Sequence, residues 1–108
     1  MRLSAKVKSA LLECFKNHFP SGTELWIFGS RVDDTALGGD LDLYVEYPKK
    51  KHPESLVFKE AYDRKLKFLV ELKSKIGHQK IDLVLNLPGI SEELPIYTIA
   101  KQEGIRLI

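Results

Sequence analysis

Hydrophobic residues recur along the chain with two different periods, and the change from one period to the other divides it into helices and strands. Steps of three and four residues predict three amphipathic helices. The first runs from Leu3 to the turn at Pro20, a long one covers about residues 54–76 and ends at Gly77, and a short one covers about residues 92–103. The apolar stripe expected on the long helix consists of Phe58, Tyr62, Leu66, Leu69, Leu72 and Ile76.

Three shorter segments have the pattern of β-strands. Residues 25–28 form an apolar run between turn residues, and residues 40–47 and 81–87 alternate apolar with polar side chains. Successive side chains of a strand point to opposite faces, so the alternation separates a core face from a second face. In the middle strand, the second face should carry Asp40, Asp42, Tyr44 and Glu46.

With a short helix expected after Ser30, the elements follow the order α-β-(short α)-β-α-β-α. This order predicts an α+β (α/β-like) fold with a three-stranded sheet flanked by helices. The chain has 108 residues, of which 44% are hydrophobic, and it shows no repeat or linker. A chain of this size can bury one modest core, so we expect a single domain over residues 1–108.

Composition favours a cytoplasmic protein. Cys14 is the only cysteine, which excludes an internal disulfide and a zinc site built on several cysteines and suits a reducing compartment. No apolar run approaches the roughly 18 residues of a membrane span, and the basic N-terminal segment is not followed by an apolar block. The chain also has no long basic face with interleaved aromatic residues, so there is no strong nucleic-acid signal.

Charge is unevenly distributed. The net charge is +2, yet residues 24–47 carry six acidic side chains and one basic side chain. Asp40 and Asp42 open the middle strand and Asp82 begins the last strand. If these strands are neighbours, three carboxylates lie close together, which is unfavourable without a cation. Such oxygen ligands suit Mg²⁺ or Mn²⁺, commonly two ions about 3.5–4 Å apart that hold a triphosphate.

Each of these carboxylates also has a simpler explanation. Asp40 and Asp42 would then be a solvated strand edge, and Asp82 would pair with a lysine such as Lys80.

The turn after the first strand supplies groups that suit phosphate. Gly29 allows close backbone approach, and Ser30 with Asp33 has the spacing of a helix N-cap. Exposed N–H groups at a helix start favour phosphate oxygens, and Arg31 adds a charged fork. A Gly-Ser pair after a strand is, however, often no more than a turn.

In combination these segments resemble a known family. Phe28-Gly29-Ser30-Arg31, Gly39-Asp40-Leu41-Asp42-Leu43 and Ile81-Asp82-Leu83-Val84 are similar to the motifs of the DNA polymerase β-like nucleotidyltransferases. The resemblance is strongest to their minimal, MNT-type members and covers essentially the whole chain. It implies a nucleotidyltransferase fold with a small mixed three-stranded sheet.

The resemblance also implies roles for individual residues. Asp40, Asp42 and Asp82 would be catalytic and would hold two Mg²⁺ ions, with Asp82 also helping to activate the acceptor hydroxyl. The nucleoside triphosphate would be bound by Gly29, Ser30, Arg31 and Gly39. The implied reaction is attack on the α-phosphate, with transfer of a nucleoside monophosphate and release of pyrophosphate.

Three functions follow as expectations. Minimal members are typically antitoxins of a HEPN-domain toxin, and some transfer AMP from ATP to a tyrosine of that protein. The first hypothesis is therefore a Mg²⁺-dependent nucleotidyltransferase antitoxin that modifies a HEPN-domain partner. The second is a non-catalytic antitoxin that neutralises its partner by binding, and the third is a small-molecule transferase of the aminoglycoside-modifying type. Ile105, Leu107 and Ile108, expected at the end of the last helix, offer a partner or dimer surface.

Overall fold

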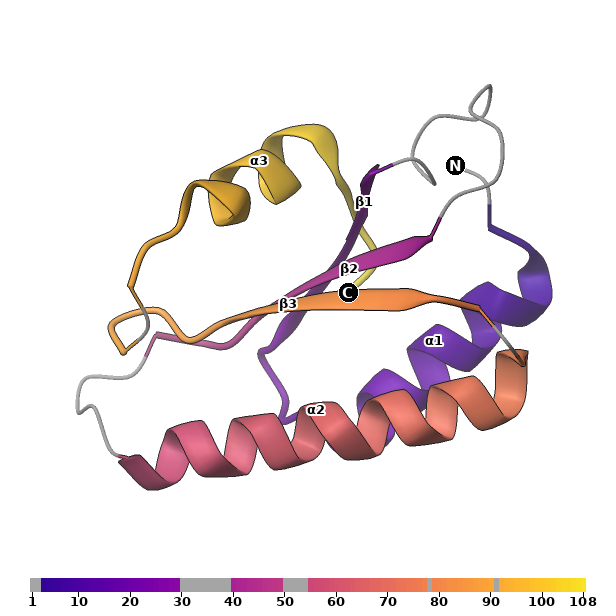
Figure 1. Ribbon diagram of the computed structural model, residues 1–108, viewed down its shortest axis with the longest axis horizontal. Helices are drawn as coiled ribbons and strands as arrows, with labels where there is room; N and C mark the ends of the chain where they lie inside the picture. The colour runs from indigo at the N-terminus through magenta and orange to yellow at the C-terminus, as the bar shows by residue number, and fades with distance from the viewer. Residues whose placement is uncertain (1–2, 30–39, 50–54, 78, 91) are drawn as a thin grey trace.

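The computed structural model describes residues 3–29, 40–49, 55–77, 79–90 and 92–108 (Figure 1). Its helices are α1 (Ala5–His18), α2 (Ser55–Ile76) and α3 (Pro95–Glu103), and its strands are β1 (Glu24–Phe28), β2 (Leu41–Glu46), β3 (Ile81–Asn86) and β4 (Ile105–Arg106). The three helices and the strands β1, β2 and β3 were all predicted from the sequence pattern. The short helix expected after Ser30 falls outside the described residues. No helix among the described residues is long and apolar enough to cross a membrane.

The strands form one mixed sheet in the order β3-β2-β1-β4. β2 pairs with β1 antiparallel and with β3 parallel, and β4 pairs antiparallel with the other side of β1. The predicted α+β fold is confirmed, with the fourth strand as an addition. β4 has only two residues, too few to show a period in the sequence. Gly104 connects it to α3, and a Cβ atom there would lie 2.2 Å from the Ala100 carbonyl oxygen, so only glycine fits this close passage.

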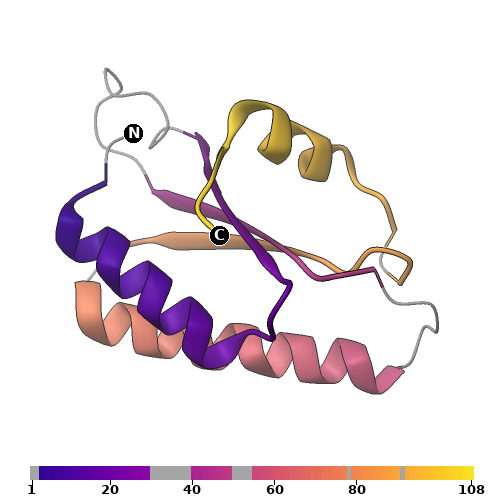
Figure 2. The ribbon, with the colours of Figure 1, turned by 180° about the vertical axis from the view of Figure 1, so that it is seen from behind.

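Two helices cover one face of the sheet and one helix covers the other. α1 and α2 lie side by side on the first face, and α3 lies on the second (Figures 1 and 2). The main core fills the space between the sheet and the two-helix layer. It includes the fully buried side chains Leu11, Leu25, Ile27, Leu41, Leu43, Val45, Phe68 and Leu72. The predicted core face of the middle strand is therefore confirmed.

Polar contacts fix the orientation of α2 against α1. The Arg64 guanidinium donates to the carbonyl oxygen of His18 at 2.8 Å. The His18 ring lies 2.5 Å from a carboxylate oxygen of Glu71. One turn further along, the Lys75 ammonium lies 3.0 Å from the Glu13 carboxylate. These contacts place one polar side of α2 against α1 and leave its opposite side facing away from α1.

The predicted stripe of α2 is only partly the buried one. Leu72 is buried as expected, but Tyr62 and Leu66 are 48% and 62% exposed, and the core is instead contacted by Ala61 and Phe68. The helix has an apolar arc wider than one stripe, and the sequence pattern cannot tell which part of a wide arc meets the sheet. The contacts with α1 rotate α2 so that the Ala61 side faces inward.

A second, smaller apolar cluster lies beneath α3. Phe28 and Tyr44 from the sheet pack against Tyr97 and Ala100 of α3, and the rings of Tyr44 and Tyr97 are 5.8 Å apart. Tyr44 shares the predicted polar face but is fully buried, because the helix covers it.

The C-terminal residues differ from expectation. Ile105 belongs to β4 and is 36% exposed, whereas Leu107 and Ile108 pack partly against the main core. The predicted placement of these three residues on the last helix is therefore wrong, and their role as a partner or dimer surface stays a prediction.

Candidate active site

The strand register gathers the predicted aspartates at one end of the sheet. Asp40 directly precedes β2, and Asp42 and Asp82 are register partners in the parallel pair β2–β3. Asp42 also pairs across the antiparallel ladder with Phe28, the last residue of β1. Because neighbouring strands lie about 4.8 Å apart, side chains in register on one face are adjacent. Two carboxylates from neighbouring strands, and a third from the residue directly before β2, thus lie where β1 ends.

Gly29 occupies a position beside the carboxylates where a side chain would not fit. It has a φ of 75°, in the left-handed region that disfavours side chains. A Cβ atom at this position would lie 2.2 Å from Oδ2 of Asp42, so the space beside Gly29 is taken by the carboxylate. Gly29 was predicted to let a phosphate approach the backbone; the structure puts the Asp42 carboxylate beside it, and a role of Gly29 toward a nucleotide stays a prediction. Ser30, Arg31 and Gly39, predicted to bind the nucleotide, lie outside the described residues.

The carboxylates influence one another electrostatically. Burial raises the pKa of Asp42 above its ordinary value, and the negative charges of Asp82 and then Asp40 raise it further. The Lys80 ammonium acts in the opposite direction. A raised pKa means that the charged form of Asp42 is disfavoured in this surrounding. Additional positive charge beside the three carboxylates would therefore favour the ionised form of Asp42.

Lys80 supplies part of that charge. Its ammonium lies 3.4 Å from Oδ2 of Asp40 and 4.0 Å from Oδ2 of Asp82. The side chain of Lys80 is 69% exposed, so water screens both contacts and another cation can displace it. The simpler expectation that Asp82 pairs with a lysine is met, although Asp40 is the nearer partner.

The donor chemistry fits a hard divalent cation. Three carboxylates are the ligands that Mg²⁺ and Mn²⁺ prefer, and their charges are close enough to perturb Asp42. As the side chains stand, however, no three His, Cys, Asp or Glu residues in the described part of the chain converge closely enough to hold a metal ion. With Lys80 between Asp40 and Asp82, a bound metal would require this ammonium to move away and the carboxylates to turn inward.

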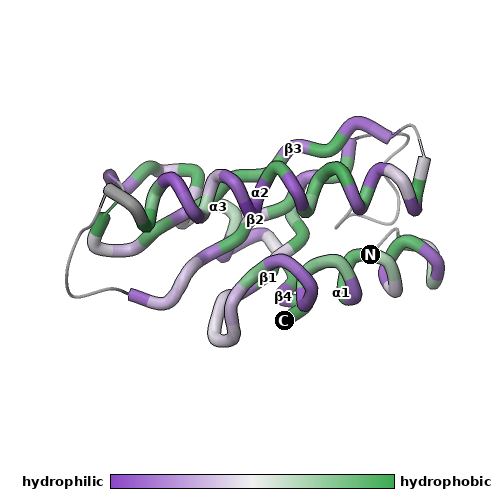
Figure 3. Tube along the Cα trace, turned by 90° about the horizontal axis from the view of Figure 1, so that it is seen from below, coloured by the Kyte–Doolittle hydropathy of each residue, from purple (hydrophilic) through white to green (hydrophobic). Residues whose placement is uncertain are grey.

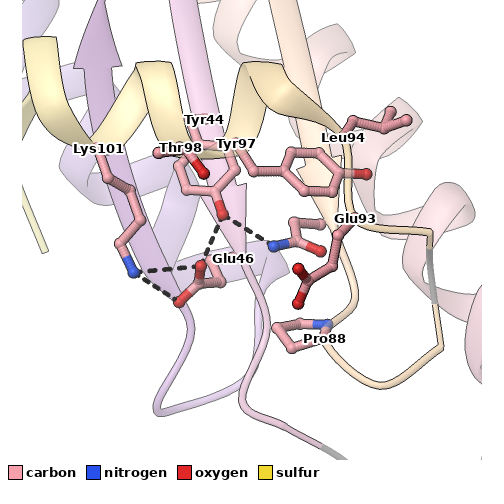
Figure 4. Close-up of a pocket in the computed structure, with 9 residues that line it drawn as sticks. Tyr44, Glu46, Pro88, Glu93, Leu94, Tyr97, Thr98 and Lys101 are labelled. Carbon is pink, nitrogen blue, oxygen red and sulfur yellow. Dashed lines mark hydrogen bonds and ion pairs between the residues drawn. The ribbon is translucent and has the colours of Figure 1, made fainter.

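A separate cavity lies on the same face at the other end of the strands (Figure 4). It has a volume of about 170 Å³ and is lined by Tyr44, Glu46, Asn86, Pro88, Glu93, Leu94, Tyr97, Thr98 and Lys101. Four residues separate Asp42 from Glu46 along β2, a distance of about 13 Å at 3.3 Å per residue. The cluster beneath α3 fills the space between, so the cavity is distinct from the carboxylate site.

A chain of hydrogen bonds forms one wall of this cavity. The Tyr44 hydroxyl donates to Glu46 at 2.6 Å and accepts from the Asn86 amide at 2.9 Å. The Lys101 ammonium of α3 lies 3.2 Å from the Glu46 carboxylate (Figure 4). Burial raises the pKa of Tyr44, so the hydroxyl stays protonated and remains a donor. This network fastens α3 to β2 and β3. Sequence reasoning missed it because Asn86 and Lys101 become neighbours of Tyr44 only in the folded chain.

A mixed sheet with acidic residues paired across two parallel strands, beside a glycine turn, is the arrangement of a nucleotidyl-transfer domain. The family model described as "Nucleotidyltransferase domain" matches residues 8–107, and the chain belongs to this family. The match supports the DNA polymerase β-like superfamily and, in general terms, transfer of a nucleoside monophosphate. The family generally uses a nucleoside triphosphate and a divalent metal. A comparison with curated proteins finds no match.

Proposed function

We propose that the protein transfers a nucleoside monophosphate, AMP from ATP, to an acceptor hydroxyl and releases pyrophosphate. The observation that carries this proposal is the pairing of Asp42 with Asp82 across β2 and β3, with Asp40 two residues away. The position of the Asp42 carboxylate beside Gly29 supports it, because it sets the acidic group against the turn after β1, where the resemblance puts the triphosphate. The family membership supports the reaction class.

In this reaction the acceptor oxygen forms a bond to the α-phosphorus, and the bond from that phosphorus to the bridging oxygen of pyrophosphate breaks. Asp40, Asp42 and Asp82 would hold two Mg²⁺ ions, for which Mn²⁺ is an alternative. When bound, the metal would neutralise the triphosphate and lower the pKa of the acceptor hydroxyl.

Asp82 is the candidate to receive the proton of the acceptor. Its side chain is 53% exposed, whereas that of Asp40 is 43% exposed and Asp42 is half-buried against Gly29. An acceptor that approaches from solvent therefore reaches Asp82 most readily. Asp42, with the more enclosed carboxylate, is the better placed of the three to stay fixed as a ligand.

We place the acceptor on a second protein, a HEPN-domain toxin for which this chain is the antitoxin. The family match over residues 8–107 supports the transferring unit, and the proposal assigns the presentation of the acceptor to the partner. This partner is the part of the proposal that depends on the resemblance to minimal nucleotidyltransferases.

The test begins with thermal unfolding of the wild type in Mg²⁺ with each nucleoside triphosphate. A ligand at about 100 times its dissociation constant adds roughly 2.7 kcal/mol, on the order of 10 °C for a small domain. The shift should be largest with ATP and absent in Asp40→Asn/Asp42→Asn. Asp63→Asn is the matched control, since its carboxylate lies on α2 in an exposed ion pair with Lys67.

The second part of the test detects the transfer itself. Incubation with ATP, Mg²⁺ and the HEPN-domain protein should raise the intact mass of that protein by one AMP and release pyrophosphate. An unchanged mass with the wild-type protein, despite a nucleotide-dependent shift in unfolding, would contradict the choice of acceptor. If no nucleoside triphosphate shifts the unfolding temperature of the wild type, the proposed nucleotide site is contradicted.

One observation favours a second candidate, a non-catalytic antitoxin that neutralises its partner by binding. Lys80 already contacts two of the three carboxylates, so the acidic group is partly neutralised within the chain. The variant Asp40→Asn/Asp42→Asn separates the two functions. It should still neutralise the partner if binding is sufficient, and it should fail to do so if transfer is required.

A further inference from the structure

The side of α2 that faces away from α1 carries an apolar stripe in contact with solvent. Tyr62, Leu66 and Val70 are 48%, 62% and 72% exposed. They follow one another at intervals of four residues and therefore lie in line along the helix. A shallow depression of about 630 Å³ beside Tyr62 and Leu66 is lined mainly by apolar surface. Three large aligned apolar side chains are an unusual feature for a free helix face.

The position of the stripe follows from the helix contacts. Arg64 and Glu71 bind α1, and at about 100° per residue both lie on the far side of α2 from Leu66. Phe68, which is buried, lies only about 40° from Arg64 around the helix, so the sheet and α1 both meet the half of α2 opposite Leu66. α2 runs beneath β2 and β3, and no other described helix or strand covers its outer flank (Figure 3). The stripe is on the opposite side of the sheet from Tyr44 and α3, so it is separate from the carboxylate site.

Charges define the two ends of the stripe. Lys59 and Lys73 lie in line with it, three residues before Tyr62 and three residues after Val70. Within the described part of the chain, neither lysine is in an ion pair. By contrast, the three acidic residues of α2 are all paired: Glu60 with Arg64, Asp63 with Lys67, and Glu71 with His18 and Lys75. The stripe is therefore an apolar line about 12 Å long, between two lysines about 21 Å apart that have no ion-pair partner among the described residues.

This charge pattern argues against a second copy of the chain as the occupant. In an antiparallel pair of α2 helices centred on Leu66, Lys59 of one copy would face Lys73 of the other. In a parallel pair, each lysine would face its own equivalent. Both arrangements place like charges together at the two ends, which is unfavourable. A membrane is also a poor match, because the apolar line is narrow and Asp63 lies along its border.

We propose that this stripe, from Lys59 to Lys73, binds an amphipathic helix of another protein. The partner helix has apolar residues over about three turns and an acidic residue at each end. Its apolar side chains would pack between Tyr62, Leu66 and Val70, and its acidic residues would pair with the two lysines. The inference does not depend on the proposed transfer reaction.

The test uses two designed peptides of roughly 18 residues, about five helical turns. Both peptides have leucines at helical spacing in their central part. One peptide has a glutamate at each end, and the other has a lysine at each end. Binding to the full chain is measured by fluorescence anisotropy or calorimetry. The glutamate peptide should bind the wild type, and Leu66→Ser should weaken this binding about tenfold or more. Ile99→Ser is the matched control, since Ile99 is an exposed apolar residue of α3 and should leave binding unchanged.

Charge reversal makes the test specific. Lys59→Glu/Lys73→Glu should transfer the preference from the glutamate peptide to the lysine peptide, and unchanged unfolding temperatures of the variants would exclude misfolding. The proposal is overturned if the glutamate peptide fails to bind at about 1 mM, or if both peptides bind equally. It is also overturned if sedimentation shows a wild-type dimer that Leu66→Ser dissociates, or if Leu66→Ser abolishes binding to anionic phosphatidylserine vesicles instead of to the peptide.

Discussion

Replacing Gly29 by alanine tests whether the carboxylate group determines the turn after β1. Two separate effects oppose a side chain at this position. The φ of 75° disfavours any residue with a Cβ atom, and the new methyl group would lie 2.2 Å from Oδ2 of Asp42. Contacts this short do not occur between real atoms, so the carboxylate must move. The substitution should therefore destabilise the protein and displace a proposed metal ligand together.

The two effects differ enough in size to be separated. A left-handed backbone costs a residue other than glycine about 1–2 kcal/mol. Moving the Asp42 side chain away from its preferred rotamer adds about 0.5–1.5 kcal/mol. Gly77 provides the reference, because its φ of 83° is similar and, apart from its chain neighbours, no described residue has an atom within 4 Å of a Cβ placed there. Gly77→Ala should show the backbone effect alone, and Gly29→Ala should show both.

Thermal and urea unfolding of the two variants measure this difference. For a domain of this size, 1 kcal/mol corresponds to roughly 4–8 °C. We expect a loss of roughly 5 °C for Gly77→Ala and of roughly 10 °C for Gly29→Ala. The three atoms nearest to the new methyl group all belong to Asp42, and Asp42→Ala removes all of them except the Cβ atom at 3.3 Å, so the extra loss at residue 29 should largely disappear.

Two results would refute this reasoning. Equal losses for the two glycine variants would mean that Asp42 does not restrict residue 29. A penalty at residue 29 that persists unchanged in Asp42→Ala would mean that another neighbour causes it. If the reasoning holds and the nucleotide site exists as proposed, the shift with Mg²⁺ and ATP should be lost in Gly29→Ala and kept in Gly77→Ala.

The remaining predictions concern the carboxylates and the network beneath α3. Asp42→Asn should stabilise the protein at pH 7, because the raised pKa of Asp42 makes its ionisation less favourable in the folded chain than in the unfolded chain. The gain should decline as the pH falls from that raised pKa towards about 3.9, and a difference independent of pH in urea titrations would contradict this cause. Lys80→Gln should strengthen Mg²⁺ binding severalfold in calorimetry. It removes a positive charge whose repulsion of another cation at 4 Å is about 1 kcal/mol in water. Weaker binding would mean that Lys80 assists the metal. Tyr44→Phe should lower the free energy of unfolding by about 1–3 kcal/mol, because Asn86 and Glu46 lose their shared hydroxyl, while nucleotide binding stays unchanged.

The sequence alone was sufficient to predict most of the individual helices and strands. Period and turn residues predicted helices and strands that lie within a few residues of those observed, because each pattern is a local consequence of burying one side of an element. The alternation in residues 40–47 also placed Asp42 and Tyr44 together on the face away from the main core. The sequence could not show that Tyr44 would be covered by α3, since the last helix gives no sign of the strand face it meets.

The remaining features of the fold depend on contacts between neighbouring elements. α2 is apolar around much of its circumference, so its contacts with α1 were needed to determine that Phe68 would be buried and Leu66 exposed. β4 is too short for a sequence pattern and exists because β1 offers it a free edge. The lysine bridge to Asp40 followed in the same way from the position of Lys80 just before β3.

By itself the sequence determined which residues could take part in chemistry: two aspartates on one face of a strand, a third at the start of another strand, and a glycine after the first. It did so because strand periodicity and the charge of a side chain are local properties. Only the tertiary structure decided that Asp42 and Asp82 are register partners and that the Asp42 carboxylate fills the space beside Gly29. Strand order and register depend on how all the buried side chains pack at once, and no single segment of the chain contains that information.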